Sequence, residues 1–242
     1  RQIAEAAYLT PDGDPQKTHF MKLLNDTMDG LVQYYVTGGY NDKFGDIQGF
    51  LMGWGEQYSQ IVGPWMQGYI VTTFAEIAGM NIPGASANPI KMLEYMHNFI
   101  SGLYTRGSDG FNPFNGAAYY LKIIDPVTQA PVTSWAQLAQ VNSADYPLNA
   151  NTLPKPSYPT SPQGYAVTAK TALANIITYT QSPNAIEAYG FISGQIALAW
   201  KNNPAGMVTA NREFPAWGVM PRLPDGEYLE ANQMQIDVSN NP

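Results

Sequence analysis

A proline that directly follows a helix-capping residue recurs along this chain, and it constrains the fold more than any other sequence feature. The pairs are Asp14-Pro15, Asn88-Pro89, Ser161-Pro162 and Ser182-Pro183, with Gly63-Pro64 as a weaker copy. A capping side chain accepts a hydrogen bond from an unpaired backbone amide, and proline at the first helical position costs no hydrogen bond. The sequence therefore predicts that a helix begins at each pair.

Apolar residues return at helical spacing behind every one of these starts, which indicates amphipathic helices. Glycines at Gly38-Gly39, Gly79 and Gly107 predict where the helices that begin at Pro15, Pro64 and Pro89 end. Short connections then predict two antiparallel helical hairpins. The expected helices cover residues 1–9, 15–37, 64–79, 89–105, 134–141, 162–180 and 183–200.

Strand signals are weaker than helix signals. Residues 118–124 are rich in aromatic and β-branched side chains, and together with 127–133 they predict a small hairpin. Residues 217–220 and 234–238 each predict a short strand. We therefore expect an all-α fold with minor β-hairpin pieces. It forms a single domain over 1–242, which the uncapped helical start predicts to be the C-terminal portion of a longer chain.

The composition excludes several classes of protein. Only 13% of the 242 residues are charged and the net charge is −7, so we expect no nucleic acid as a partner. With no cysteine and two histidines, the sequence predicts no metal and no cofactor. No apolar run reaches the roughly 18 residues that a membrane span needs. Low charge and abundant Asn, Gly, Tyr and Thr are typical of an extracellular or periplasmic protein.

Successive helical hairpins, aromatic-rich loops and an acidic composition resemble the α/α-toroid proteins, which include six-hairpin glycosidases and toroidal polysaccharide lyases. The stretches 8–15, 64–69 and 111–117 are similar to bacterial toroid-type proteins whose function is not established. The resemblance covers roughly residues 1–200 and rests on no diagnostic catalytic motif. It implies that the hairpins form part of a toroid, and that the protein acts on or holds an extracellular polysaccharide or oligosaccharide.

Two acids fit the needs of a glycoside hydrolase, which requires a pair of carboxyl groups facing one sugar. Glu56 lies in a glycine- and aromatic-rich segment before the helix at 64, and Asp109 follows the helix 89–105. If these helices are antiparallel neighbours, both acids lie at the same end of the bundle, which predicts them as the catalytic pair. The alternative is that Asp109 forms a turn and Glu56 is a solvated loop acid.

A polysaccharide lyase instead needs a base and a cation, for which Tyr58, His97 and Arg106 are candidates. His97 also fits a hydrogen-bonded core histidine, because it falls on the apolar stripe of its helix. Arg106 is favoured near a helix C-terminus whatever the function, because of the helix dipole.

Aromatic and amide side chains predict contacts with sugars, because sugar rings pack on aromatic faces and amides bind hydroxyl groups. Core packing is the alternative for Trp65. A second class of function also stays open, a non-catalytic structural or assembly protein of the cell exterior, whose Tyr- and Asn-rich surface contacts a protein partner or its own copies. The candidate substrate-binding residues are Trp54, Tyr58, Trp65, Arg106, Phe111, Asn112 and Asn115.

Overall fold

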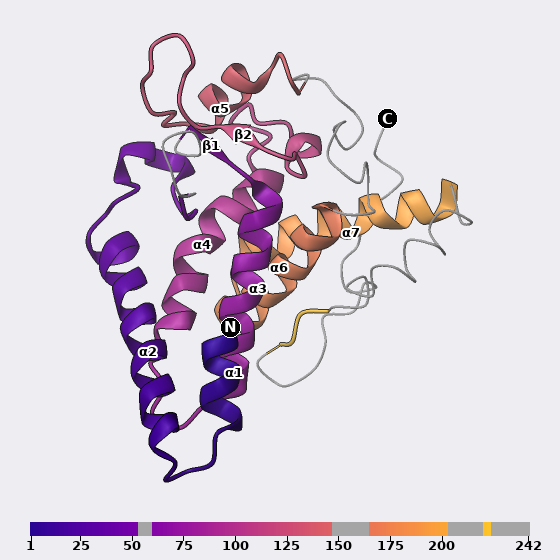
Figure 1. Cartoon of the computed structure of the whole chain (residues 1–242). Coiled ribbons are helices and arrows are strands. Elements are labelled where there is room, and N and C mark those ends of the chain that lie inside the picture. The colour runs from indigo at the N-terminus through magenta and orange to yellow at the C-terminus, as the bar shows by residue number, and fades with distance from the viewer. Residues whose placement is uncertain (53–59, 147–164, 203–219, 224–242) are drawn as a thin grey trace.

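The computed structural model describes residues 1–52, 60–146, 165–202 and 220–223, and in them it confirms an all-α fold with a small β component (Figure 1). The α-helices are α1 (Gln2–Leu9), α2 (Pro15–Leu31), α3 (Pro64–Met80), α4 (Asn88–Thr105), α5 (Trp135–Asn142), α6 (Tyr165–Thr180) and α7 (Pro183–Asn202). A π-helix η1 (Val32–Thr37), two 3₁₀ helices η2 (Asp42–Ile47) and η4 (Pro113–Asn115), and strands β1 (Ile61–Val62) and β2 (Leu121–Lys122) complete the described elements.

Capping residues begin the helices largely as the sequence predicts. Asp14 accepts a hydrogen bond from the amide of Gln16 at 2.8 Å, and the Ser134 and Ser182 hydroxyls cap α5 and α7 in the same way. The prediction for Asn88 is wrong. Its amide group donates to Asp29 of α2 at 2.6 Å, and the Ser86 hydroxyl accepts from the Asn88 backbone amide instead. The start at Ser161-Pro162 lies outside the described residues.

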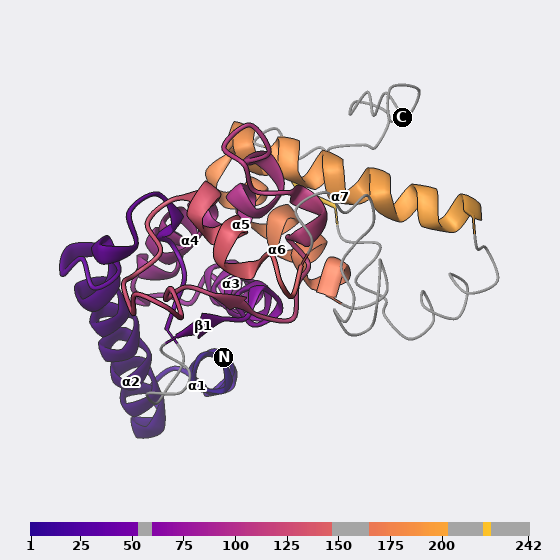
Figure 2. The ribbon, with the colours of Figure 1, turned by 90° about the horizontal axis from the view of Figure 1, so that it is seen from above.

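Helices α3, α4, α6 and α7 pack together at the centre, while α1 and α2 lie to one side (Figures 1 and 2). The two predicted hairpins are present as α3–α4 and α6–α7. Small residues permit close packing of α3 on α6. A Cβ atom added at Gly68 would lie 3.1 Å from the backbone oxygen of Thr168, and Ala172 is fully buried. Helix α2 does not stop directly at a glycine, because the chain first winds into η1, which ends at Gly38.

The small sheet differs from the prediction in the strand that pairs with β2. β2 pairs antiparallel with β1, which the sequence did not indicate, with Ile61 opposite Lys122 and Val62 opposite Leu121. The predicted turn back to 127–133 is present only as an isolated bridge between Ile124 and Pro131. The β1–β2 ladder holds the start of α3 beside the segment that follows α4. The predicted strands 217–220 and 234–238 lie outside the described residues, apart from Met220.

In the part of the chain that the structure describes, no helix is both long enough and apolar enough to cross a bilayer.

Candidate functional site

The structure describes only one of the two residues in the predicted catalytic pair. Glu56 lies outside the described residues, as do Trp54 and Tyr58, so the pair stays a prediction. Asp109 is exposed, and its Oδ2 lies 3.3 Å from Nη1 of Arg106. The Ser108 hydroxyl also donates to Asp109, at 3.4 Å. The cation and the acid at this end of α4 therefore neutralise each other.

The sequence predicts Phe111 and Asn115 as sugar contacts, but the structure buries both side chains in the protein interior. Phe111 is only 1% exposed, and its ring lies edge-on to Trp135 with the ring centroids 5.5 Å apart. Asn115 is 3% exposed. Asn112 has a structural role, because its Oδ1 accepts from the Phe114 amide at 3.0 Å and begins η4. A polysaccharide at the surface cannot stack on Phe111, since the core covers its ring.

Trp65 instead lies in a cluster of four aromatic rings, here called the Trp65 cluster, that comes from three parts of the chain. Its other members are Tyr69 of α3, Tyr119 before β2 and Tyr165 at the start of α6. The rings of Trp65 and Tyr119 are parallel within 2°, with centroids 6.0 Å apart, and Tyr165 lies 5.7 Å from Trp65. Tyr69 is 59% exposed and Tyr119 is 46% exposed. The cluster thus presents aromatic surface to solvent around a half-buried tryptophan.

The sequence contained a signal for only one of these added tyrosines. Tyr69 follows Trp65 by one helical turn, and residues at this spacing are neighbours on a helix surface. Tyr119 and Tyr165 join the cluster through tertiary packing alone. The sequence places Tyr119 in a strand-forming segment and Tyr165 on the apolar face of a helix.

A second aromatic cluster, the Tyr34 cluster, was not predicted. It contains Tyr34 and Tyr35 of η1, Tyr40, and Tyr95 of α4, with Lys43 beside them. The ring centroids of Tyr34 and Tyr40 are 4.2 Å apart, and the Lys43 ammonium lies 4.9 Å from the Tyr40 centroid. A hydrogen bond with Tyr40 raises the pKa of Tyr34 to about 12. The double tyrosine before Gly38-Gly39 was the available sequence signal.

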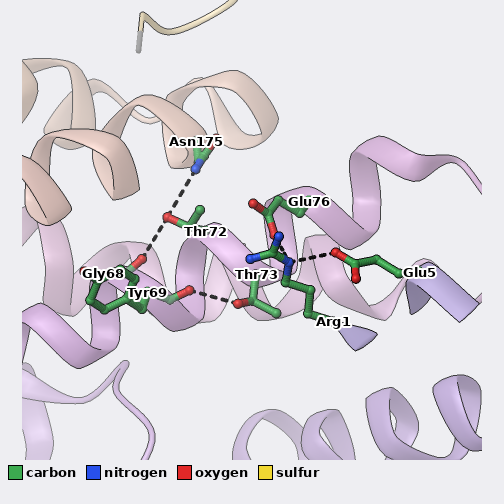
Figure 3. Close-up of polar contacts among 8 residues, drawn as sticks. All are labelled: Arg1, Glu5, Gly68, Tyr69, Thr72, Thr73, Glu76 and Asn175. Atoms are coloured by element: carbon green, nitrogen blue, oxygen red, sulfur yellow. Dashed lines mark hydrogen bonds and ion pairs between the residues drawn. The ribbon is translucent and has the colours of Figure 1, made fainter. Parts of the chain in front are cut away.

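A polar group lies along the helix that carries Trp65 (Figure 3). Nε of Arg1 contacts Oε1 of Glu5 at 2.9 Å and Oε2 of Glu76 at 3.1 Å, which links α1 to α3. These three residues are here called the Arg1 group. Between this group and Tyr69, the Thr73 hydroxyl donates to the Tyr69 carbonyl at 3.0 Å. The carboxylates of Glu5 and Glu76 together raise the pKa of the Arg1 guanidinium.

The histidine proposed for lyase chemistry does not join these clusters. Nδ1 of His97 contacts the carbonyl of Glu94 in its own helix, and the ring is half-buried. Among the described residues, no three His, Asp or Glu side chains gather as they would to hold a metal ion. The comparisons found no family model, no curated protein and no solved structure that matches the chain.

Proposed function

We propose that this chain is a carbohydrate-binding protein of the α/α-toroid type, and that it holds an extracellular polysaccharide or oligosaccharide at the Trp65 cluster. One observation carries the proposal. Two tyrosine rings, Tyr69 and Tyr119, remain about half exposed although they pack around a tryptophan. Exposed aromatic surface is costly in water unless a ligand or partner covers it. The apolar C–H face of a sugar ring is suited to cover such rings.

The geometry of the described residues supports binding better than catalysis. Asp109 forms an ion pair with Arg106, so a sugar carboxylate would have to compete with Asp109 for this guanidinium. Nδ1 of His97 already contacts the carbonyl of Glu94 in its own helix. Hydrolysis by Glu56 and Asp109 is therefore a separate hypothesis. It requires that the unaltered chain releases reducing sugars, and that Glu56→Gln and Asp109→Asn each abolish this release while the protein stays folded.

The toroid assignment and the extracellular or periplasmic location are part of the same proposal. The α3–α4 and α6–α7 hairpins support the first, because toroids are assembled from such pairs. The low charge content and the lack of cysteine support the second.

Affinity gel electrophoresis with a polysaccharide cast into the gel tests the binding. We expect the polysaccharide to slow the unaltered chain, and Tyr69→Ala with Tyr119→Ala to abolish the effect. Tyr8→Ala is the matched control, because Tyr8 is 56% exposed on α1 and lies in neither aromatic cluster. Equal retardation of the double variant and the control would remove the Trp65 cluster as the site.

The Tyr34 cluster favours a second candidate function, a structural or assembly protein. Tyr34 and Tyr40 place two partly exposed rings on a surface that a second copy or another protein can cover. Sedimentation equilibrium measures self-association directly. Concentration-dependent dimers that Tyr34→Ala removes, together with no retardation by any polysaccharide, would favour this function over sugar binding.

A further inference from the structure

We propose that Tyr34 and Tyr40 form a site of oxidative cross-linking, at which a one-electron oxidant of the peroxidase class joins the two rings as dityrosine. This modification is independent of sugar binding at the Trp65 cluster. It follows from the turn that holds the two residues together, from the distance between their rings and from their exposure.

A tight turn brings the two tyrosines together. η1 ends at Gly38, and the chain then reverses, so that the backbone amide of Tyr40 donates to the carbonyl of Tyr34 at 3.3 Å. Gly39 permits this reversal, because its φ of 60° lies in the left-handed region that favours glycine. The backbone itself therefore fixes the two residues next to each other.

The two rings lie closer than most aromatic pairs do. Their centroids are 4.2 Å apart and their planes are tilted by 30°, whereas aromatic pairs usually keep their centroids roughly 4.5–7 Å apart. Tyr34 also contacts Tyr35, but that pair is edge-on, with the centroids 5.0 Å apart. The hydrogen bond between the Tyr34 and Tyr40 phenols places their oxygen atoms close together, and so also the ring carbons beside these oxygens.

Both rings are open to an oxidant in solution. Tyr34 is 48% exposed and Tyr40 is 37% exposed. Tyr35 is buried, and its hydroxyl accepts a hydrogen bond from the amide of Met52 at 3.2 Å. The two rings with the closest contact are therefore also the ones that an oxidant can reach.

The reaction balances with hydrogen peroxide as the electron acceptor. Each phenol loses one electron and one proton, which leaves a neutral radical whose unpaired electron is shared with the ring carbons beside the oxygen. The proton leaves Tyr40 with the electron, because the Lys43 ammonium, 4.9 Å from the Tyr40 centroid, disfavours a positively charged ring. The two radicals combine into one carbon–carbon bond, and the hydrogen on each bonded carbon moves as a proton to the phenol oxygen of the same ring. The peroxide takes up the two electrons and two protons and becomes two molecules of water.

Oxidation of the unaltered chain by a peroxidase and hydrogen peroxide, at low protein concentration, tests the site. We expect dityrosine fluorescence in protein that still runs as a monomer on a denaturing gel. Chymotrypsin cleaves after Tyr35, between the two residues. The digest should therefore contain the Tyr34 and Tyr40 peptides joined to each other, with a mass that is two hydrogens below the sum of the two peptides.

Phenylalanine variants keep the ring packing and remove one phenol each. Tyr34→Phe and Tyr40→Phe should each abolish the monomeric dityrosine product. Tyr8→Phe is the control and should leave its yield unchanged, because Tyr8 is 56% exposed on α1 but lies in neither aromatic cluster.

Three results would overturn the inference. The first is an equal yield of monomeric dityrosine in Tyr34→Phe and the unaltered chain, which would place the link at another pair, such as Tyr119 and Tyr165 with centroids 5.6 Å apart. The second is dityrosine found only in dimers. The third is no dityrosine in the protein while free tyrosine in the same mixture is coupled.

Discussion

The side chain of Gln67 is hydrogen bonded in both directions to the backbone of Leu51. Its Nε2 donates to the Leu51 carbonyl at 2.9 Å, and its Oε1 accepts from the Leu51 amide at 2.9 Å. Gln67 is fully buried in α3. One side chain thus pairs with an extended segment as a neighbouring strand would. It holds that segment against α3 close to Trp65.

Replacing Gln67 with alanine should destabilise the fold by about 2–4 kcal/mol, because both polar groups of Leu51 lose their partner in a partly buried place. Urea denaturation measures the change in the free energy of unfolding. Gln140→Ala is the control, since Gln140 is exposed on α5. Equal stability of the two variants would mean that water satisfies Leu51 as well as Gln67 does.

Two glycines in helices should respond to alanine in opposite ways. A Cβ atom at Gly102 of α4 would lie 2.6 Å from Cη2 of the buried Trp135 ring, so Gly102→Ala should cost about 1–3 kcal/mol through overpacking. A Cβ atom at Gly30 of α2 meets nothing within 4 Å. Gly30→Ala should therefore stabilise by about 0.5–1 kcal/mol, because alanine is the better helix former.

Thermal unfolding of the two variants checks this pair of predictions. A melting temperature that rises for Gly30→Ala and falls for Gly102→Ala is the expected outcome. A Gly102→Ala protein as stable as the unaltered chain would show that Trp135 moves aside at little cost.

Alkaline pH should destabilise the protein through its buried tyrosines. Burial raises the pKa of Tyr95 to about 12, and it raises the pKa of Tyr189 to the same value. The folded state therefore keeps these phenol protons at a pH where the unfolded chain, with a pKa of about 10, has released them. The stability that they contribute is complete below about pH 10 and is lost as the pH rises towards about 12.

The variant Tyr95→Phe should lose less stability between these two pH values than the unaltered chain. Denaturation curves at pH 9 and pH 11 measure the difference, with Tyr8→Phe as the control for an exposed phenol. An unchanged pH dependence in Tyr95→Phe would show that Tyr95 ionises equally in the folded and unfolded states.

The sequence predicted parts of the candidate site and missed others for a definite reason. Trp65 was predicted as a sugar contact, and its position in α3 explains why Tyr69 lies next to it. Phe111 was predicted from its place in an aromatic loop, but contact with Trp135 takes it into the core. Loop composition does not reveal which ring is buried, because burial depends on residues that are distant in sequence.

Local interactions were thus determined by the sequence itself. The caps at Asp14, Ser134 and Ser182 each join groups within three residues, so a short stretch of sequence contains both partners. Tertiary structure decided the rest. Asn88 left its expected capping role because Asp29, fifty-nine residues away, accepts its hydrogen bond. β2 likewise found β1 rather than the adjacent segment, and Tyr119 and Tyr165 met Trp65 from separate elements. In each case the competing partner is close only after the helices have packed, and so no local pattern could identify it.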